Sequence, residues 1–358
     1  MKDLHGGNIY KFQREGKNDI LDYSSNINPL GVPQKFIDIA KENFDKLVNY
    51  PDPYYIELRK KIAEFNSLNM DNIIVGNGAT EILFLYIRAL KPKKVLILAP
   101  CFAEYERALK SVSAKIEYFG LKESDNFYPN IINLKKEVEN NNYDLLLLCN
   151  PNNPTGQFIK LEDIKEIVKT CENKNTKIFI DEAFIEFIEN WKEKTVSLLK
   201  NKNVFIMRAF TKFFAIPGLR LGYGIGFNED ILKKMWEEKE PWTVNTFANL
   251  AGLIMLDDKE YIEKSEKWIL EEKKFMYKEL NEFQYINAYK TECNFILIKI
   301  YNISSASLRD KMIEKNILIR DASNFKFLDY HFVRLAIKDR KSNLKMLEVL
   351  ADIMEYRG

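Results

Sequence analysis

Lys212 is the residue whose surroundings most directly suggest chemistry. It lies in the segment RAFTKFFAIPGLRLGY (208–223), among aromatic and aliphatic side chains, and Arg220 follows eight residues later. Burial disfavours a charged ammonium, so the pKa of such a lysine falls toward the range in which the amine is a nucleophile. Lysines that form Schiff bases are activated in this way. The alternative is a lysine whose amine reaches solvent past its apolar neighbours, which is commoner in proteins in general.

Three further polar segments follow apolar runs. GNGATE (76–81) can bind a phosphate through backbone N–H groups at a helix start, although any strand-to-helix turn needs a glycine and a capping residue. NPNNPTG (150–156) is a rigid turn whose asparagine amides can point at a ligand, or an ordinary loop. Asp181 ends the run KIFID, and a buried carboxylate there needs a partner, either a protonated pyridine nitrogen or a structural Lys or Arg.

The spacing of apolar runs predicts how these segments are positioned. Runs expected to be strands alternate with amphipathic stretches expected to be helices, which is typical of a mostly parallel sheet. The expected strands are 72–78, 94–100, 115–120, 143–151, 177–184 and 203–210, and the expected helices include 80–90, 104–112 and 162–172. In such sheets ligands bind at the carboxyl ends of strands, which is where the polar segments fall.

The pattern of expected helices and strands changes near Asn245. A long charged helix (257–282) is followed by shorter strands (294–300 and 331–337) and a C-terminal helix. We therefore predict an α/β fold with a large domain, 29–244, built on a mostly parallel central sheet, and a smaller α+β domain, 245–358. The N-terminal segment, 1–28, is expected to pack with the small domain and the active site.

The four segments together match the needs of one cofactor. Pyridoxal phosphate requires a phosphate cradle, a partner for its ring oxygen, a partner for its ring nitrogen and a Schiff-base amine. GNGATE, the asparagine loop, Asp181 and Lys212 supply these parts in that order along the chain. The sequence therefore predicts a pyridoxal-phosphate enzyme.

The chain resembles the fold-type I pyridoxal-phosphate enzymes of the aminotransferase class I and II family, nearly end to end. Within that family it is most similar to the threonine-phosphate decarboxylases of cobalamin biosynthesis, with the histidinol-phosphate aminotransferases as close relatives. The stretches that carry the resemblance are HGGNIY (5–10), LDYSSNINPLGVP (21–33), YPDPYY (50–55), GNGATE, APCFAEY (99–105), CNPNNPTG (149–156), DEAFIEF (181–187), TKFFAIPGLRLGYG (211–224), ILIRDASNF (317–325) and VRLAI (333–337).

The resemblance implies roles for the matching positions around the cofactor ring. Lys212 forms the covalent linkage to pyridoxal phosphate, and Asp181 pairs with the pyridinium nitrogen. Asn153 contacts the ring hydroxyl, and Phe102 stacks on the ring. The groups expected around the cofactor phosphate belong to Gly78, Ala79, Thr80, Thr211 and Arg220.

The resemblance also implies how subunit and substrate meet the cofactor. Tyr50 is similar to a tyrosine that reaches the cofactor phosphate of the neighbouring subunit, which implies a homodimer with shared active sites. The positions expected to contact a small phosphorylated amino-acid substrate are His5, Gly6, Asn26, Asn153, Arg320 and Arg334. One position departs from the pattern: three residues before the lysine, relatives usually have a Ser or Thr that bonds the phosphate, and this chain has Ala209.

Decarboxylation and transamination differ in which bond to the substrate's Cα lies perpendicular to the cofactor ring, which is a matter of positioning. Three features favour decarboxylation of O-phospho-L-threonine to aminopropanol phosphate. Phe184 stands where aminotransferases usually have a tyrosine, the HGGN segment matches the decarboxylases, and TKFFAIPG differs from the usual histidinol-phosphate sequence around the lysine. Neutral variation at Phe184 or an ordinary N-terminal turn are the alternatives.

Histidinol-phosphate aminotransferase remains the second hypothesis. A non-catalytic regulator that binds the cofactor is a distant third, because no basic recognition helix stands out.

Composition excludes several other classes of function. A net charge of +2, from 54 basic against 52 acidic residues, gives no reason to expect nucleic acid as a partner. Two histidines and four scattered cysteines argue against a metal site. No segment reaches the length of a membrane span, and the N-terminus lacks the apolar core of a signal peptide. We therefore expect a cytoplasmic protein that does not bind membranes.

Overall fold

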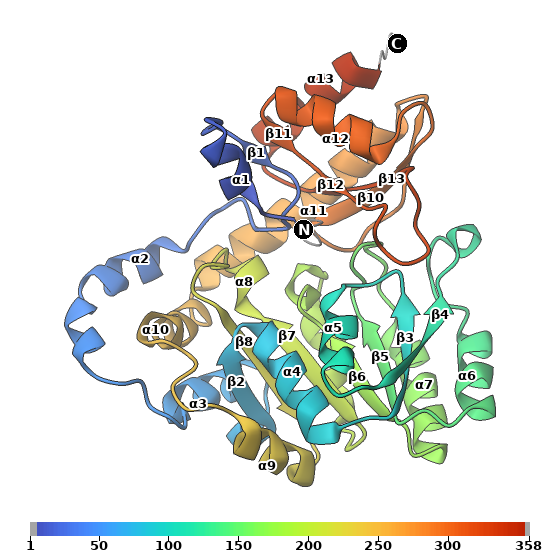
Figure 1. Cartoon of the computed structure of the whole chain (residues 1–358). Helices are drawn as coiled ribbons and strands as arrows, with labels where there is room; N and C mark the ends of the chain where they lie inside the picture. Colours follow the sequence, from blue (N-terminus) through green and yellow to red (C-terminus); the bar gives the residue numbers. More distant parts are fainter. Residues whose placement is uncertain (1–5, 355–358) are drawn as a thin grey trace.

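A seven-stranded sheet forms the centre of the larger part of the molecule (Figure 1). The structure is a computed structural model that describes residues 6–354. In spatial order the strands are β2 (Ile73–Asn77), β8 (Leu221–Gly226), β7 (Val204–Ala209), β6 (Lys177–Asp181), β5 (Leu145–Cys149), β3 (Lys94–Ala99) and β4 (Lys115–Gly120). From β7 to β4 all neighbours are parallel, which confirms the predicted mostly parallel sheet.

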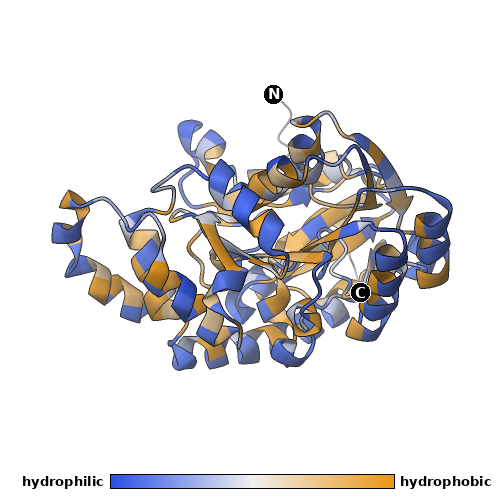
Figure 2. Cartoon of the chain, turned by 90° about the horizontal axis from the view of Figure 1, so that it is seen from below, coloured by the Kyte–Doolittle hydropathy of each residue, from blue (hydrophilic) through white to orange (hydrophobic). Residues whose placement is uncertain are grey.

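Helices cover both faces of this sheet. One face packs against α4 (Ala79–Leu90), α5 (Glu104–Lys110) and α9 (Glu229–Glu238). The other packs against α3 (Ile56–Phe65), α6 (Ile131–Asn140), α7 (Leu161–Asn173) and α10 (Thr246–Met255). The central strands are mostly hydrophobic, whereas the helices around them carry both kinds of residue (Figure 2). Burial on both faces explains why these strands appear in the sequence as continuous apolar runs.

Strand β8 was not expected from the sequence. It runs antiparallel to both β7 and β2, and three of its six residues are glycine, which weakens any strand signal. The structure gives a reason for one of them. A Cβ on Gly222 would lie 2.3 Å from the backbone nitrogen of Ala79, so only glycine allows β8 to pass this close to the start of α4.

A smaller antiparallel sheet lies above the carboxyl ends of the large sheet's strands (Figure 1). Its strands in order are β12 (Arg320–Asp321), β13 (Phe332–Ala336), β10 (Phe295–Ile300) and β9 (Ile286–Ala288), and its helices are α11 (Lys259–Asn281), α12 (Ser305–Glu314) and α13 (Arg340–Met354). The boundary at 244/245 stays a prediction; α10, which follows it, packs against α3 and β8 of the large domain.

The N-terminal segment lies alongside the small sheet. After α1 (Ile9–Arg14), strand β1 (Leu21–Asp22) pairs in parallel with β11 (Ile317–Leu318). The phenol of Tyr23 donates to Asn343 Oδ1 over 2.9 Å, and Tyr23 is fully buried. Next, α2 (Gln34–Lys41) and the short helix η1 (Phe44–Val48) project to one side of the molecule (Figure 1).

Candidate active site

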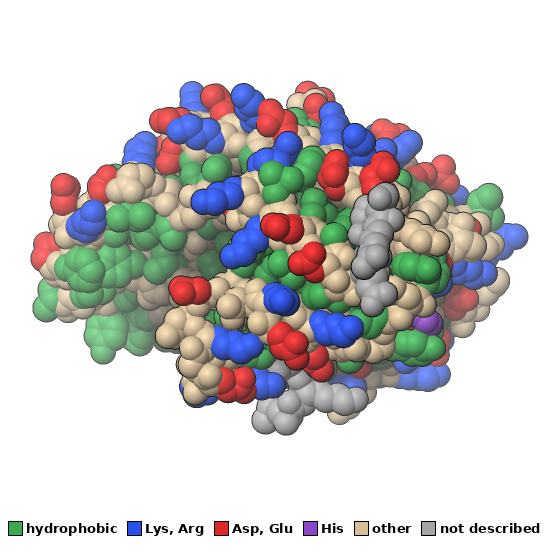
Figure 3. Space-filling model, turned by 90° about the horizontal axis from the view of Figure 1, so that it is seen from above, with side chains coloured by type: hydrophobic (Ala, Val, Ile, Leu, Met, Phe, Trp, Pro, Cys, Tyr) green, Lys and Arg blue, Asp and Glu red, His purple; other side chains and the backbone are tan. Residues whose placement is uncertain are grey.

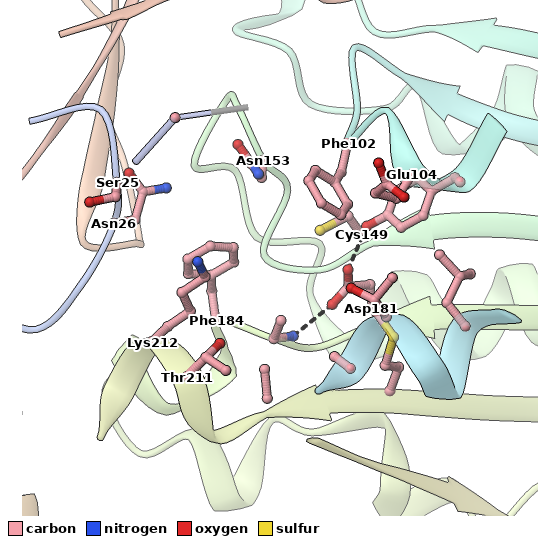
Figure 4. Close-up of a pocket in the computed structure, with 18 of the residues that line it drawn as sticks. Ser25, Asn26, Phe102, Glu104, Cys149, Asn153, Asp181, Phe184, Thr211 and Lys212 are labelled. Atoms are coloured by element: carbon pink, nitrogen blue, oxygen red, sulfur yellow. Dashed lines mark hydrogen bonds between the residues drawn. The ribbon is translucent and has the colours of Figure 1, made fainter. Parts of the chain in front are cut away.

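The predicted site residues converge on one cavity of about 480 Å³ between the large sheet and the small domain. Figure 4 shows Lys212, Asp181, Phe102 and Asn153 around the same space. The predicted residues that line the cavity are Gly6, Asn26, Ala79, Thr80, Phe102, Asn153, Asp181, Thr211, Lys212, Arg220, Arg320 and Arg334. Three predicted residues are not in this lining: Gly78 lies beside it, Tyr50 is exposed on the surface, and His5 falls outside the described residues.

Lys212 is placed by a short helix at the end of β7. The helix α8 (Phe210–Phe213) turns the chain as soon as the strand ends, and Phe210 and Phe213 are buried on either side of the lysine in sequence. Desolvation lowers the pKa of the Lys212 amine to about 8, and the positive charges of Arg334 and Arg220 act in the same direction. A large fraction of the amine is therefore neutral near pH 8, as a nucleophile requires.

Asp181 ends β6, the strand beside β7, and is 5% exposed. Its Oδ2 accepts a hydrogen bond of 2.6 Å from the phenol of Tyr105, and its Oδ1 accepts one of 2.8 Å from the backbone N–H of Ala183. Desolvation raises the pKa of the carboxyl group to about 6, although both hydrogen bonds lower it. Asp181 is thus mostly ionised at neutral pH, as the partner of a protonated ring nitrogen must be.

Tyr105 was missed as a site residue from the sequence alone. It lies in the APCFAEY stretch that carried the family resemblance, but nothing in that stretch shows that its hydroxyl reaches a strand end 76 residues later. The structure identifies it because Tyr105 is fully buried beside the buried Asp181 carboxylate, and a buried phenol needs a hydrogen-bond partner.

A positively charged cradle forms where α4 begins. Gly78 is the N-cap residue with φ +76°, and a Cβ there would lie 2.4 Å from Arg220 Nη2. The guanidinium of Arg220 therefore packs directly against the backbone at the helix start. A helix N-terminus and a cation together favour a phosphate dianion, and Thr80 and Thr211 line the cavity nearby. Ala209 also lines the cavity, and its methyl group offers no donor.

Arg334 on β13 faces this cavity from the small domain. Its Nη1 donates to Asn153 Oδ1 and its Nη2 to the backbone oxygen of Ser24, both over 2.6 Å. The pKa of the Arg334 guanidinium is lowered to about 9, mainly by desolvation and next by the positive charge of Arg320. The guanidinium therefore stays cationic at neutral pH. Within residues 6–354, the buried atoms Arg334 Nε and Asn26 Oδ1 have no hydrogen-bond partner. Buried polar atoms are rarely left unpaired, which indicates that a polar ligand completes the site.

Arg320 on β12 is the second cation on the small-domain side and is 7% exposed. Its Nη2 donates to Asn324 Oδ1 over 2.8 Å, and its Nη1 donates to the backbone oxygen of Asp321. The guanidinium lies 5.0 Å from the ring centre of Phe325. These contacts fix the cation at the cavity wall.

The residues present fit pyridoxal phosphate. The cradle suits its phosphate, Asp181 its ring nitrogen, and Lys212 its aldehyde. Asn153 uses its carbonyl oxygen on Arg334, so its amide Nδ2 is the donor that could meet the ring hydroxyl. The described part of the chain contains no group of three or more His, Cys, Asp or Glu side chains that could hold a metal ion.

Comparison with known proteins identifies the family. A model of the aminotransferase class I and II family matches residues 18–350. The chain belongs to this family. Aminotransferase class I and II enzymes depend on pyridoxal phosphate, in agreement with the cavity described above, and their fold-type I architecture matches the sheets and helices of this chain.

Individual members of the family are similar over nearly the whole chain. A protein of Caldanaerobacter subterraneus subsp. tengcongensis, provisionally named threonine-phosphate decarboxylase, is 44% identical over 98% of this chain and 94% of its own. The threonine-phosphate decarboxylase of Salmonella typhimurium is 33% identical over 98% and 96%. The crystal structure of the histidinol-phosphate aminotransferase from Clostridium acetobutylicum is 38% identical, covers 94% of this chain and 99% of its own, and superposes with a TM-score of 0.88. No helix in residues 6–354 is long and apolar enough to cross a membrane.

Proposed function

We propose that this enzyme decarboxylates O-phospho-L-threonine to (R)-1-aminopropan-2-yl phosphate and CO₂ in cobalamin biosynthesis. The observation that carries the proposal is the similarity to threonine-phosphate decarboxylases over 98% of the chain, and the buried arginines Arg320 and Arg334, which face the cavity of Lys212 from the small domain, agree with it. The substrate carries two anions, a phosphate and a carboxylate, and buried cations are the expected partners for both. The end-to-end similarity to threonine-phosphate decarboxylases supports the same substrate.

The cavity residues have different roles in the proposed reaction. Bound pyridoxal phosphate withdraws electrons from the bonds to the substrate's Cα. Lys212 would hold the cofactor through its amine and would release it to the amine of the substrate. Arg334 fixes the orientation of the carboxylate, and Arg320 binds the phosphate, so binding energy from the non-reacting phosphate helps to position the bond that breaks.

Two groups control charge and protons after CO₂ leaves. Asp181, ionised at neutral pH, stabilises positive charge at the ring nitrogen. Lys212 Nζ, once released from the cofactor, is a cavity group that can return a proton to Cα. Phe184, whose ring lines the cavity, gives an apolar surface where a tyrosine would place a hydroxyl. Gly6, from the N-terminal segment, helps to close the cavity and limit water access.

The second candidate is a histidinol-phosphate aminotransferase. The observation that favours it is the 38% identity to the Clostridium acetobutylicum enzyme of that name. Its substrate also carries a phosphate, so the arginines alone do not distinguish the two reactions. They differ in products, since only decarboxylation releases CO₂ and only transamination converts 2-oxoglutarate to glutamate.

The deciding experiment therefore supplies both substrates to the holoenzyme. We expect CO₂ and aminopropanol phosphate from O-phospho-L-threonine, and no glutamate from histidinol phosphate with 2-oxoglutarate. Lys212→Ala is the control that should abolish either reaction. Glutamate formation without CO₂ release would assign the enzyme to the second candidate.

We also propose that the enzyme acts as a homodimer. Large apolar side chains are exposed along η1 and the loop that follows it, and hydrophobic side chains gather at the end of the molecule where α2 lies (Figure 3). The exposed residues of this patch are Phe44, Leu47, Val48, Tyr50, Tyr54 and Trp242. Tyr50 is 81% exposed, and its ring centre lies 4.9 Å from that of Trp242. Exposed apolar patches of this kind mark protein interfaces, and a second copy of this chain is the occupant that the Tyr50 resemblance implies.

A further inference from the structure

A buried ion pair lies directly behind the active site. Arg208 on β7 and Glu182, which follows β6, are both 0% exposed. Arg208 donates to Glu182 Oε2 through Nε over 3.0 Å and through Nη2 over 2.8 Å. Neither residue lines the cavity, and the reaction outlined above uses neither of them.

The pair joins the two strands that carry the catalytic residues. Asp181 and Met207 are register partners on β6 and β7, and both line the cavity. Successive side chains of a strand point to opposite faces, so Glu182 and Arg208 point away from the cavity. The backbone bond from Glu182 N–H to the oxygen of Met207, 2.8 Å, is the last between these strands. Beyond it the chains diverge, one toward Ala183 and the other toward the helix of Lys212. The ion pair links them at this point, and farther along the rings of Phe187 and Phe213 are in contact, with centres 5.4 Å apart.

The remaining polar atoms of the pair are anchored to neighbouring segments. Thr195 bridges the pair, because its Oγ1 accepts from Arg208 Nη2 over 2.5 Å and donates to Glu182 Oε2 over 2.8 Å. Glu182 Oε1 accepts from the backbone N–H of Val196 over 2.8 Å. Arg208 Nη1 donates to Asn66 Oδ1 over 2.6 Å. The hydrogen bonds of this ion pair are directional and fix the relative position of the two side chains, whereas an apolar contact would let the two segments shift against each other.

A third charged residue belongs to the cluster without linking the strands. Glu186 is 5% exposed, and its Oε2 has no hydrogen-bond partner within the described residues. Burial raises the pKa of Glu186 to about 7, although the charge of Arg208 opposes this. Glu186 is thus a natural control, since it is a buried carboxyl in the same cluster that makes no bond to Arg208.

We propose that Glu182 and Arg208 are positioning residues, which set the distance between the Asp181 carboxylate and the Lys212 amine by clamping the ends of β6 and β7. Asp181 and Lys212 must meet opposite ends of one rigid ring system, so a small change in their separation misplaces the cofactor. Misplacement of this kind lowers turnover more than it lowers substrate binding. The proposal holds whichever of the two reactions the enzyme catalyses, because it concerns the cofactor.

The test compares Glu182→Gln with Glu186→Gln in the holoenzyme. Three readouts are measured: the pH midpoint of the cofactor's visible absorbance, kcat and KM separately, and the thermal unfolding midpoint. In Glu182→Gln we expect kcat to fall on the order of tenfold to a hundredfold with KM changed by less than about threefold. We also expect the absorbance midpoint to shift. Glu186→Gln should leave kcat and the absorbance midpoint close to those of the parent enzyme.

Two outcomes would overturn the proposal. One is a Glu182→Gln enzyme that is less heat-stable but keeps the parent kcat and absorbance midpoint, which would make the pair a purely structural feature. The other is an equal effect of both substitutions, which would show that charge and not the link between strands matters. If Glu182→Gln does not fold, Thr195→Val removes the bridging hydroxyl, which also accepts a hydrogen bond of 3.2 Å from the Ser197 N–H, and leaves both charged side chains in place. It should shift both readouts in the same direction by a smaller amount, and a change in thermal stability alone would refute the proposal. The absorbance readout does not depend on the substrate, so this result is separate from the assignment of the reaction.

Discussion

The phenol of Tyr105 donates a hydrogen bond of 2.6 Å to Asp181 Oδ2, and both side chains are buried. This bond favours the ionised carboxylate and so opposes the desolvation that raises the pKa of Asp181 to about 6. Tyr105→Phe removes the donor and should raise that pKa further, leaving less carboxylate ionised at neutral pH. A hydrogen bond to a charged group is worth about 1.5–3 kcal/mol, so we expect kcat to fall roughly tenfold to a hundredfold.

The measurement is a pH profile of kcat for the parent and for Tyr105→Phe. The acidic limb of the profile should move to higher pH in the variant, because Asp181 then loses its charge at a higher pH. Tyr86→Phe is the matched control, since Tyr86 is also buried but lies outside the cavity lining. An unchanged acidic limb in Tyr105→Phe would argue against this role.

Capture of pyridoxal phosphate by the apoprotein should depend on the protonation of Lys212. The attacking amine must be neutral, and burial lowers its pKa to about 8. The rate of capture should therefore rise with pH, with a midpoint near 8, and level off above it. Arg334→Met removes a positive charge that lowers this pKa, so the midpoint should move upward.

Absorbance changes on mixing apoprotein with cofactor across this pH range measure the effect. Arg107→Met is the control, because the Arg107 side chain is 74% exposed and solvent screens its charge. Borohydride reduction followed by peptide mapping should then find the cofactor on Lys212. Recovery of the adduct on a different lysine would refute the assignment of the nucleophile.

Arg320 should recognise the substrate phosphate. Arg320→Ala should lower kcat/KM for O-phospho-L-threonine by the equivalent of about 2–5 kcal/mol, because the cation is buried and well oriented. The same variant should hardly change any activity with unphosphorylated L-threonine. Equal losses with both substrates would show that Arg320 does not act on the phosphate.

Ala209 offers a test of the cofactor phosphate site. Ala209→Ser would place a hydroxyl at a position that lines the cavity beside Thr211. A new hydrogen bond of about 0.5–1.5 kcal/mol should slow the loss of cofactor about twofold to tenfold. Dialysis followed by absorbance measures that loss, and Ala183→Ser, which also lines the cavity, serves as the control. Faster loss from Ala209→Ser would mean that the site has no room for the donor.

Dimer formation should depend on the exposed apolar patch around η1. Val48 is 86% exposed, and Val48→Asp would place a charge in the patch. Sedimentation should show a dimer for the parent and a shift toward monomer for the variant, with loss of activity if Tyr50 completes the partner's site. Leu344→Asp, at an exposed leucine on α13, is the matched control. An active monomeric parent enzyme would refute the proposal.

Much of the fold could be predicted from the sequence because local composition and tertiary environment agree. The strands β3, β5 and β6 are buried on both faces, and their runs of aliphatic residues already show this. The helix α11, expected at 257–282, extends over Lys259–Asn281. Strand β8 could not be found because its three glycines weaken the strand pattern, and the reason for Gly222 is close approach to the start of α4, a distant segment.

The sequence by itself determined the chemical parts of the site and their order along the chain. Lys212, Asp181 and the asparagine loop follow apolar strands, and parallel strands bring their carboxyl ends to one edge. That rule needs only the order of the strands along the chain.

Only the tertiary structure decided which groups tune those parts. Tyr105 is hydrogen-bonded to Asp181, 76 residues away in the sequence, and Arg334 to Asn153, 181 residues away. Arg208 is paired with Glu182 on the face of the sheet that points away from the cavity. Each of these contacts depends on the direction of a side chain and on water being excluded around it. Both properties arise from packing between segments that are far apart in the chain, and local sequence does not encode them.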